Sequence, residues 1–376
     1  MPIELFFDLV YVFAITQLSH LLLGHLGPAG AAQTLLLTLA VWWAWMYATW
    51  TTNYCDPDHP AMRLTLAGMM LAGLAMAAAV PQAFGARALW FAAAYVTLQV
   101  GRSTVVAIAA RNSPHGHLFR LILIWHTAAA LLWIGGALAG GAVQVLLWVT
   151  ALAAEYAAPW HGYRLPFLRR SGTTEWTIDG AHMAERCQLF VILALGESIL
   201  LTGLTLAEGD HLSAATVTAF AVAFLTSMAM WWVYFDRTAE AAAEKIATSA
   251  DRGRLGRSAY TYSHIPIVAG VIVTAVGDEL AIAHPLDTTT AGIVLTVLGG
   301  PALFLAGHAA FHRTVFGDLP AGRIAALAVL AATALAALLM PSILTPLVLA
   351  TVAVLVVGTV ALRDRRPPAR GTAVAG

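Results

Sequence analysis

The chain has 376 residues, of which 60% are hydrophobic and only 11% charged, and its formal net charge is zero. Ordinary soluble domains carry roughly 45–50% apolar and 25% charged residues, so this composition excludes a soluble globular protein. The neutral balance gives no basic surface for nucleic acid. The two cysteines, Cys55 and Cys187, lie in no CxxC or Cys/His pattern, which argues against a disulfide scaffold or a zinc finger.

Apolar runs of about 20 residues, long enough to cross a ~30 Å hydrocarbon layer, recur along the whole chain. They predict an all-α integral membrane protein with about twelve transmembrane helices. The predicted spans are 4–26, 33–54, 62–80, 86–110, 117–139, 142–160, 186–206, 212–235, 258–283, 290–313, 321–340 and 342–362. We expect no cleavable signal peptide, because the first span lacks a basic leader and contains Asp8.

Lysine and arginine residues in the loops between the predicted spans, or near the ends of those spans, fall into alternate loops. They are Arg63, Arg111, Arg120, Arg164, Arg169, Arg170, Arg237, Lys245, Arg252, Arg254, Arg257, Arg313 and Arg323, with further arginines in the C-terminal tail. The opposite loops hold only Arg87. Because cytoplasmic loops carry the excess of Lys and Arg, this alternation predicts twelve spans with both termini in the cytoplasm.

A weak internal repeat relates the two halves of the chain. Tyr54-Cys55-Asp56 aligns with Tyr234-Phe235-Asp236, and Glu4 aligns with Glu185 at nearly the same offset. We predict two six-helix repeats, which share one orientation because six crossings are an even number. The predicted boundaries are 1–160 for the first repeat, 161–185 for a cytoplasmic linker, 186–362 for the second repeat and 363–376 for a basic cytoplasmic tail. The alternative is a chance alignment of apolar segments.

Ionisable residues inside the predicted spans are candidates for function, since a charge at mid-bilayer costs about 2.5–3.5 kcal/mol by insertion scales. Glu4 and Asp8 share one face of the first span, one turn apart. The candidates for proton handling are Asp8, Glu185, Glu197 and His264. Arg102 lies in the middle of the fourth span and needs an acidic partner, for which we expect Glu197 or Asp8. Alternatively, these residues only tie helices together.

Two further patterns fit metal ligands. His308 and His312 lie one turn apart on the tenth span, although the Glu of an HExxH motif is missing. Asp56 and Asp58 follow the second span, and Asp236 occupies the matching place in the second half. Their carboxylates could hold a divalent cation.

The same aspartates have a second interpretation. Together with Arg63, Asp56 and Asp58 could hold a phosphate, in a loop of the general kind that intramembrane prenyl-transfer enzymes use. Asp-Pro-Asp is also a good turn and a good start for a helix, so a purely structural role stays open.

Several motifs resemble those of the bacterial low-temperature-requirement A family. They are Glu4-Leu5-Phe6-Phe7-Asp8-Leu9-Val10-Tyr11, Asn53-x-x-Asp56-x-Asp58 with Arg63, His182-x-x-Glu185-Arg186 followed by Leu195-Gly196-Glu197-Ser198, Trp231-Trp232-x-Tyr234-Phe235-Asp236, and Tyr262-Ser263-His264. The resemblance implies a polytopic protein of the bacterial plasma membrane, named for a growth phenotype in the cold, and it lends no substrate or cofactor. It marks for testing Glu4, Asp8, Asp56, Asp58, Arg63, His182, Glu185, Arg186, Glu197, Asp236 and His264.

Three hypotheses for the function follow. The first is a proton-linked secondary carrier with a buried cavity of Glu, His and Arg side chains, in which Asp8 and Arg102 are charge partners. The second is an intramembrane enzyme that acts on a lipid or isoprenoid through Asp8, Asp56, Asp58 and Asp236. The third is a structural, cold- or stress-adaptive membrane protein. In each case the lipid bilayer is the expected surrounding, and the sequence identifies no substrate and no cofactor.

Overall fold

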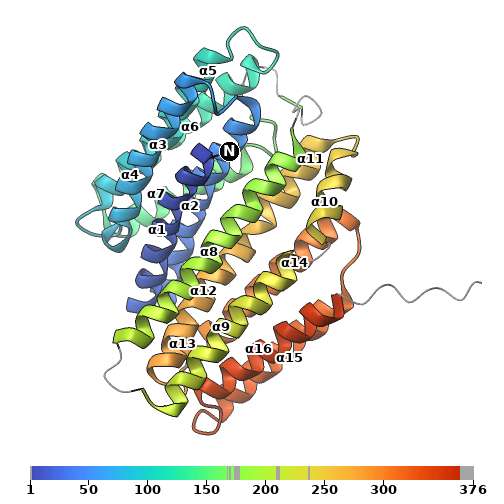
Figure 1. Ribbon diagram of the computed structural model, residues 1–376. Helices are drawn as coiled ribbons and strands as arrows, with labels where there is room; N and C mark the ends of the chain where they lie inside the picture. Colours follow the sequence, from blue (N-terminus) through green and yellow to red (C-terminus); the bar gives the residue numbers. More distant parts are fainter. Residues whose placement is uncertain are drawn as a thin grey trace, which may run out of the picture. The chain divides into compact units, whose positions relative to one another are not determined.

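The computed structural model describes residues 2–166, 168, 171–172, 178–208, 212–235 and 238–364. Throughout this part of the chain the regular elements are helices (Figure 1). In chain order they are α1 (Pro2–Gly24), α2 (Pro28–Tyr54), α3 (Pro60–Ala79), η1 (Val80–Gln82), α4 (Ala88–Val96), η2 (Thr97–Gly101), α5 (Arg102–Ala109), α6 (Gly116–Ala139), α7 (Gly141–Ala157), α8 (Gly180–Glu208), α9 (Ala214–Phe235), α10 (Thr238–Ala247), α11 (Arg252–Gly256), η4 (Arg257–Tyr262), α12 (His264–Ala283), α13 (Ala291–Val297), α14 (Gly299–Phe316), α15 (Ala321–Leu339) and α16 (Pro346–Asp364).

Within the described residues, eleven helical segments are long and apolar enough to cross a membrane. The sixth predicted span, 142–160, corresponds to α7, whose 17 residues give a length of only about 26 Å. The structure ends this helix at Ala157 and places Pro159 and Trp160 in turns, because a proline does not continue a helix. The prediction of twelve full-length spans is therefore not confirmed, and the orientation of the termini stays a prediction.

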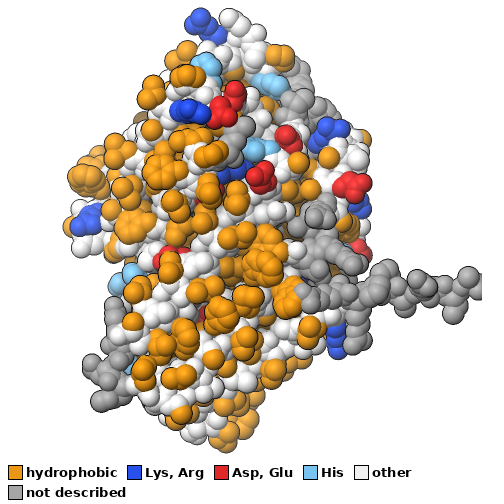
Figure 2. All heavy atoms as spheres, in the orientation of Figure 1, with side chains coloured by type: hydrophobic (Ala, Val, Ile, Leu, Met, Phe, Trp, Pro, Cys, Tyr) orange, Lys and Arg blue, Asp and Glu red, His pale blue; other side chains and the backbone are white. Residues whose placement is uncertain are grey.

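Apolar side chains cover much of the face that Figure 2 shows, and many large ones are exposed. Leu64, Leu71, Trp90 and Leu131 are each at least 69% exposed. Contiguous apolar surface of this kind marks a protein that meets lipid or a partner rather than water. Together with the long apolar helices, it identifies a multi-pass membrane protein.

The chain divides into two compact units. The first unit comprises residues 1–193 and 244–265, and the second comprises residues 194–243 and 266–376. In the first unit α1 packs on α2 and α3, and α6 packs on α4 and α7. In the second unit α9 runs beside α16, and α15 packs on α14 and α16 (Figure 1). The predicted duplication, with repeats at 1–160 and 186–362, stays a prediction.

Helix α2 carries polar and aromatic side chains on two opposite faces, and both faces belong to the first unit. Successive residues of a helix are rotated by about 100°, so residues two apart point in nearly opposite directions. One face presents Trp45, Thr49, Thr52 and Asn53. The other face presents Trp43, Tyr47, Trp50 and Tyr54. The first face meets a cluster of charged side chains, and the second lines a pocket.

In the second unit α12 crosses the α13–α14 segment at very short range. A Cβ atom on Gly270 would lie 2.5 Å from the backbone nitrogen of Phe304, and one on Gly300 would lie 2.4 Å from that of Thr274. Small residues let helix backbones approach this closely, which is the usual means of helix association in membranes.

Candidate functional site

The centre of the candidate site is a buried ion pair between α1 and α8. The Arg186 guanidinium donates two hydrogen bonds to Asp8, from Nη1 to Oδ2 at 2.7 Å and from Nη2 to Oδ1 at 2.7 Å. The Trp45 indole donates to Asp8 Oδ1 at 2.7 Å, and its ring lies 5.7 Å from the Arg186 guanidinium carbon. Both charged side chains are almost fully buried. This two-point geometry is the strong form of a carboxylate–guanidinium contact.

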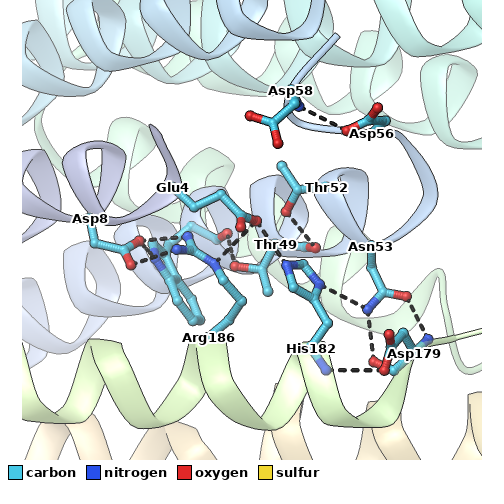
Figure 3. Close-up of polar contacts among 11 residues, drawn as sticks. Glu4, Asp8, Thr49, Thr52, Asn53, Asp56, Asp58, Asp179, His182 and Arg186 are labelled. Atoms are coloured by element: carbon cyan, nitrogen blue, oxygen red, sulfur yellow. Dashed lines mark hydrogen bonds and ion pairs between the residues drawn. The ribbon is translucent and has the colours of Figure 1, made fainter. Parts of the chain in front are cut away.

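A second carboxylate joins the same guanidinium. Glu4 lies one turn before Asp8 on α1 and is 1% exposed. Its Oε1 lies 3.7 Å from Arg186 Nε and 2.9 Å from His182 Nε2 (Figure 3). His182 and Arg186 are four residues apart on α8, so both side chains project from one face of that helix. The His182 side chain is 20% exposed, so the cluster reaches the protein surface at this histidine.

Asn53 and Asp179 tie the end of α2 to the beginning of α8. Asn53 Nδ2 donates to the Asp179 carbonyl at 2.9 Å, and its Oδ1 accepts from the Asp179 backbone nitrogen at 2.9 Å. Asp179 in turn caps α8, since its Oδ1 accepts from the backbone nitrogens of Ala181 and His182. Asn53 Nδ2 also lies 3.2 Å from His182 Nδ1 (Figure 3).

This arrangement assigns the protons on the His182 ring. The Asn53 amide cannot be flipped, because its oxygen already accepts from Asp179. Its Nδ2 group therefore donates to His182 Nδ1, which must be the unprotonated nitrogen of the ring. The proton then lies on Nε2, which donates to Glu4. The network thus holds His182 in one neutral tautomer.

Arg102 is buried in the same unit but takes part in a different network. It donates to the Tyr47 carbonyl at 2.9 Å, to Thr51 Oγ1 at 3.1 Å, and to Gln99 Oε1 and Ser103 Oγ at 3.2 Å. The expected pairing with Asp8 is thus not formed, because Asp8 bonds Arg186 instead. Pairing with Glu197, which belongs to the second unit, stays a prediction.

A chain of hydrogen bonds connects Arg102 to the acid Glu155 in the first unit. Gln99 Nε2 donates to the Tyr95 hydroxyl at 3.2 Å, and this hydroxyl donates to Glu155 Oε2 at 2.6 Å. Arg102 and Glu155 are therefore linked through two intervening side chains rather than in direct contact.

A family model described as bacterial low temperature requirement A protein matches residues 1–358. The chain belongs to this family. A protein of Rhizobium meliloti (strain 1021), described as uncharacterized, is 39% identical over 330 residues, which is 87% of this chain and 80% of the relative. No solved structure matches the chain.

Three of the family motifs converge on one cluster in the first unit. Glu4 and Asp8 come from the first motif, Asn53 from the second, and His182 and Arg186 from the third. The cluster therefore brings together residues that are up to 182 positions apart in the sequence. We call Glu4, Asp8, His182 and Arg186 the ionic cluster.

Other residues of the family motifs do not join the ionic cluster. Glu185 is exposed on α8. His264 is 1% exposed, stacks on Trp42 with ring centroids 6.4 Å apart, and has its Nδ1 3.0 Å from the Ala259 carbonyl. Glu197 is buried on α8.

The candidate metal ligands lie in separate surroundings. Asp56 Oδ1 accepts from the Asp58 backbone nitrogen at 2.9 Å, and Asp58 pairs with Arg63 at 2.8 Å on an exposed surface. His308 is buried, whereas His312 is half-buried with its Nδ1 3.2 Å from the Asp318 carbonyl. Among the described residues, no group of three or more His, Cys, Asp or Glu could hold a metal ion. Asp236 lies outside the described residues.

The sequence interpretation missed three residues of interest. Asn53 was noted only as part of a motif, although it fixes the tautomer of His182. Arg257 was counted as a loop charge, but it is 4% exposed and lies in the span Arg252–Ala283. Asp278, an acid inside the same span, is 5% exposed, and its Oδ2 has no hydrogen-bond partner among the described residues. Its position inside an apolar run was the signal that could have identified it.

Proposed function

We propose that the protein is a proton-linked secondary carrier of the bacterial plasma membrane, in which the ionic cluster handles the proton. The observation that supports this proposal most is the position of the His182 ring. The ring reaches the surface on one side and bonds the buried Glu4 on the other. Histidine is also the side chain whose charge changes most readily near neutral pH.

A proton taken up at His182 Nδ1 would have two consequences. It would place a second positive charge beside the two buried carboxylates, which in the neutral tautomer face the single guanidinium of Arg186. It would also turn Nδ1 into a donor that faces the Asn53 donor, so this hydrogen bond would be lost. Proton uptake would thereby loosen the tie between the end of α2 and the start of α8.

This coupling is what a secondary carrier needs, because a proton must change the relative stability of two conformations. With both termini in the cytoplasm, as the charge alternation predicts, His182 would exchange protons with the cytoplasm. The enzyme hypothesis has less support, since both carboxylates already have partners. Asp56 accepts from the Asp58 backbone nitrogen, and Asp58 pairs with Arg63.

Transport in everted membrane vesicles tests this proposal. Respiring vesicles that contain the protein would hold a pH gradient reported by acridine orange, and a panel of carboxylates, phosphate esters, amino acids and amines would be added. We expect at least one class of solute to collapse the gradient with the wild-type protein, and not with His182→Gln. Glutamine keeps the approximate size and the hydrogen-bonding capacity of the side chain but binds no proton.

Asp58→Asn is the matched control, because Asp58 is exposed and bonds Arg63 outside the ionic cluster. It should transport like the wild type. Equal gradient collapse with wild type and His182→Gln, at equal amounts of protein, would contradict the proposal. So would the absence of any response across the panel.

A further inference from the structure

The first unit contains a pocket on the face of α2 opposite the ionic cluster. It lies between α2, α5, α6 and η4. The enclosed part measures about 50 Å³, and the wider empty space of about 580 Å³ includes open solvent at its mouth. Its wall is mainly aromatic and aliphatic, with Trp50, Tyr54 and Phe119 among the lining residues, and it contains two arginines, Arg102 and Arg257.

Arg102 places a buried positive charge at this pocket. The side chain is 4% exposed, and its hydrogen bonds go to four uncharged groups. Its Nε has no hydrogen-bond partner among the described residues. Its guanidinium carbon also lies 4.6 Å from the centre of the Tyr47 ring. A buried cation that bonds only neutral groups is costly unless an anion comes to it.

Arg257 lines the same pocket from η4. It is 4% exposed, donates to the Pro159 carbonyl at 2.6 Å, and stacks over the Trp160 ring at 4.5 Å. Two guanidinium groups at one apolar pocket are suited to an anion, since guanidinium binds carboxylate and phosphate oxygens through paired N–H groups. The aromatic wall is suited to an apolar body attached to that anion.

The backbone is also irregular beside both arginines. The π-helical turn η2 (Thr97–Gly101) directly precedes Arg102, and the π-helical turn η4 (Arg257–Tyr262) begins with Arg257. Single π-helical turns inside α-helices occur frequently at functional sites. In η4 the Thr261 carbonyl accepts from the Trp42 indole at 2.8 Å, and Thr261 Oγ1 accepts from the Trp50 indole at 3.1 Å. These bonds from α2 hold the turn against the pocket.

We propose that this pocket binds an anionic amphiphile, with a phosphate or carboxylate group at Arg102 and Arg257 and an alkyl or aryl body against Trp50, Tyr54 and Phe119. That this ligand is also the carried solute rests on the proposed function. Trp50 and Tyr54 are half-buried, so the pocket is reached from the surface at the C-terminal end of α2.

Binding of hexyl phosphate to the purified full-length protein in phosphatidylcholine nanodiscs tests the site. Calorimetry should show that hexyl phosphate binds more tightly than inorganic phosphate and more tightly than hexanol, because only hexyl phosphate satisfies both parts of the pocket. Arg102→Gln should weaken binding about tenfold or more, as expected for the loss of a charge-assisted hydrogen bond. The exposed Arg120 provides the control, and Arg120→Gln should bind like the wild type.

Val106→Phe provides a second variant in case Arg102→Gln does not fold. Val106 lines the pocket one turn after Arg102, so a larger side chain should reduce binding while both arginines remain. Equal affinity for hexyl phosphate and inorganic phosphate would overturn the proposal, and so would unchanged binding in folded Arg102→Gln or in folded Val106→Phe. The ligand could come from the bilayer or from solution, and adding phosphatidic acid to the nanodiscs distinguishes the two. Competition between phosphatidic acid and hexyl phosphate supports a ligand from the bilayer, and no competition supports a ligand from solution.

The binding and transport experiments together show which of the two proposals has failed. His182→Gln should leave hexyl phosphate binding unchanged, since His182 belongs to the opposite face of α2 and lies outside the pocket. Intact binding without any proton-linked transport would contradict only the carrier proposal. Proton-linked transport of another solute, with no binding of hexyl phosphate, would contradict only the pocket proposal.

Discussion

Asp8→Ala should destabilise the protein by about 3–5 kcal/mol, the usual consequence of breaking a buried ion pair. The Arg186 guanidinium would lose both of its short hydrogen bonds, and the Trp45 indole would lose its acceptor. All three groups are buried, so water cannot replace the missing carboxylate. Thermal and denaturant unfolding of the purified protein, followed by tryptophan fluorescence, measures the change.

Two further variants make this prediction specific. Asp58→Ala removes a salt bridge whose side chains are 59% and 49% exposed, and it should change stability by at most about 1 kcal/mol. The double variant Asp8→Leu/Arg186→Met replaces the buried pair by apolar side chains, and it should recover part of the loss, because neither member of the pair is left unpaired while Glu4 keeps its hydrogen bond with His182. If Asp8→Ala unfolds at the wild-type midpoint, the ion pair is not buried as described.

Gly300→Ala should cost about 1–3 kcal/mol or more, as overpacking of a closely packed interior does. The added Cβ would lie 2.4 Å from the Thr274 nitrogen and 2.5 Å from its Oγ1, so α12 and α14 would have to separate. Gly270→Ala on the facing helix should act in the same way, since its Cβ would lie 2.5 Å from the Phe304 nitrogen. The melting temperature in detergent reports both changes.

Gly358→Ala on α16 is the matched control. Outside the neighbouring backbone of α16, no heavy atom of the described residues lies within 4 Å of the position of its added Cβ. Because alanine favours a helix over glycine by up to about 1 kcal/mol, this variant should be as stable as the wild type or slightly more stable. Equal melting temperatures for Gly300→Ala and Gly358→Ala would show that α12 and α14 are not in close contact.

The fold class could be predicted from the sequence because hydrophobic runs and helix length follow from local composition. The all-helical architecture is confirmed for the described residues, among which eleven helical segments are long and apolar enough to cross a membrane. The span 142–160 is not confirmed at full length, because Pro159 and Trp160 follow the end of α7. Arg257 was counted as part of a basic loop, whereas the structure includes it in the helical segment Arg252–Ala283.

The members of the ionic cluster could be identified from the sequence, but their pairing could not. Glu4, Asp8, His182 and Arg186 were all candidates, through their position in spans or through the family resemblance. Periodicity places Glu4 and Asp8 on one face of α1, but it does not say which helix meets that face. Asp8 was therefore paired with Arg102, whereas the structure pairs it with Arg186, 178 positions away. Such long-range partners depend on helix packing, which a single sequence does not specify.

The pH dependence of the distance between α2 and α8 tests the central claim most directly. Spin labels at Cys55, which directly follows α2, and at Ala181→Cys, on an exposed position of α8, report this distance in a Cys187→Ala background. Burial raises the pKa of the Cys55 thiol, so labelling is carried out at alkaline pH. Double electron–electron resonance on the protein in nanodiscs then compares the distance between the two labels at pH 8 and at pH 5. These values lie on either side of the ordinary titration range of histidine.

At pH 5 the wild-type distance distribution should be longer or broader than at pH 8, because protonated His182 no longer accepts from Asn53. In His182→Gln the two distributions should coincide. Identical distributions at both pH values in the wild type would contradict the account, as would an equal pH response in His182→Gln.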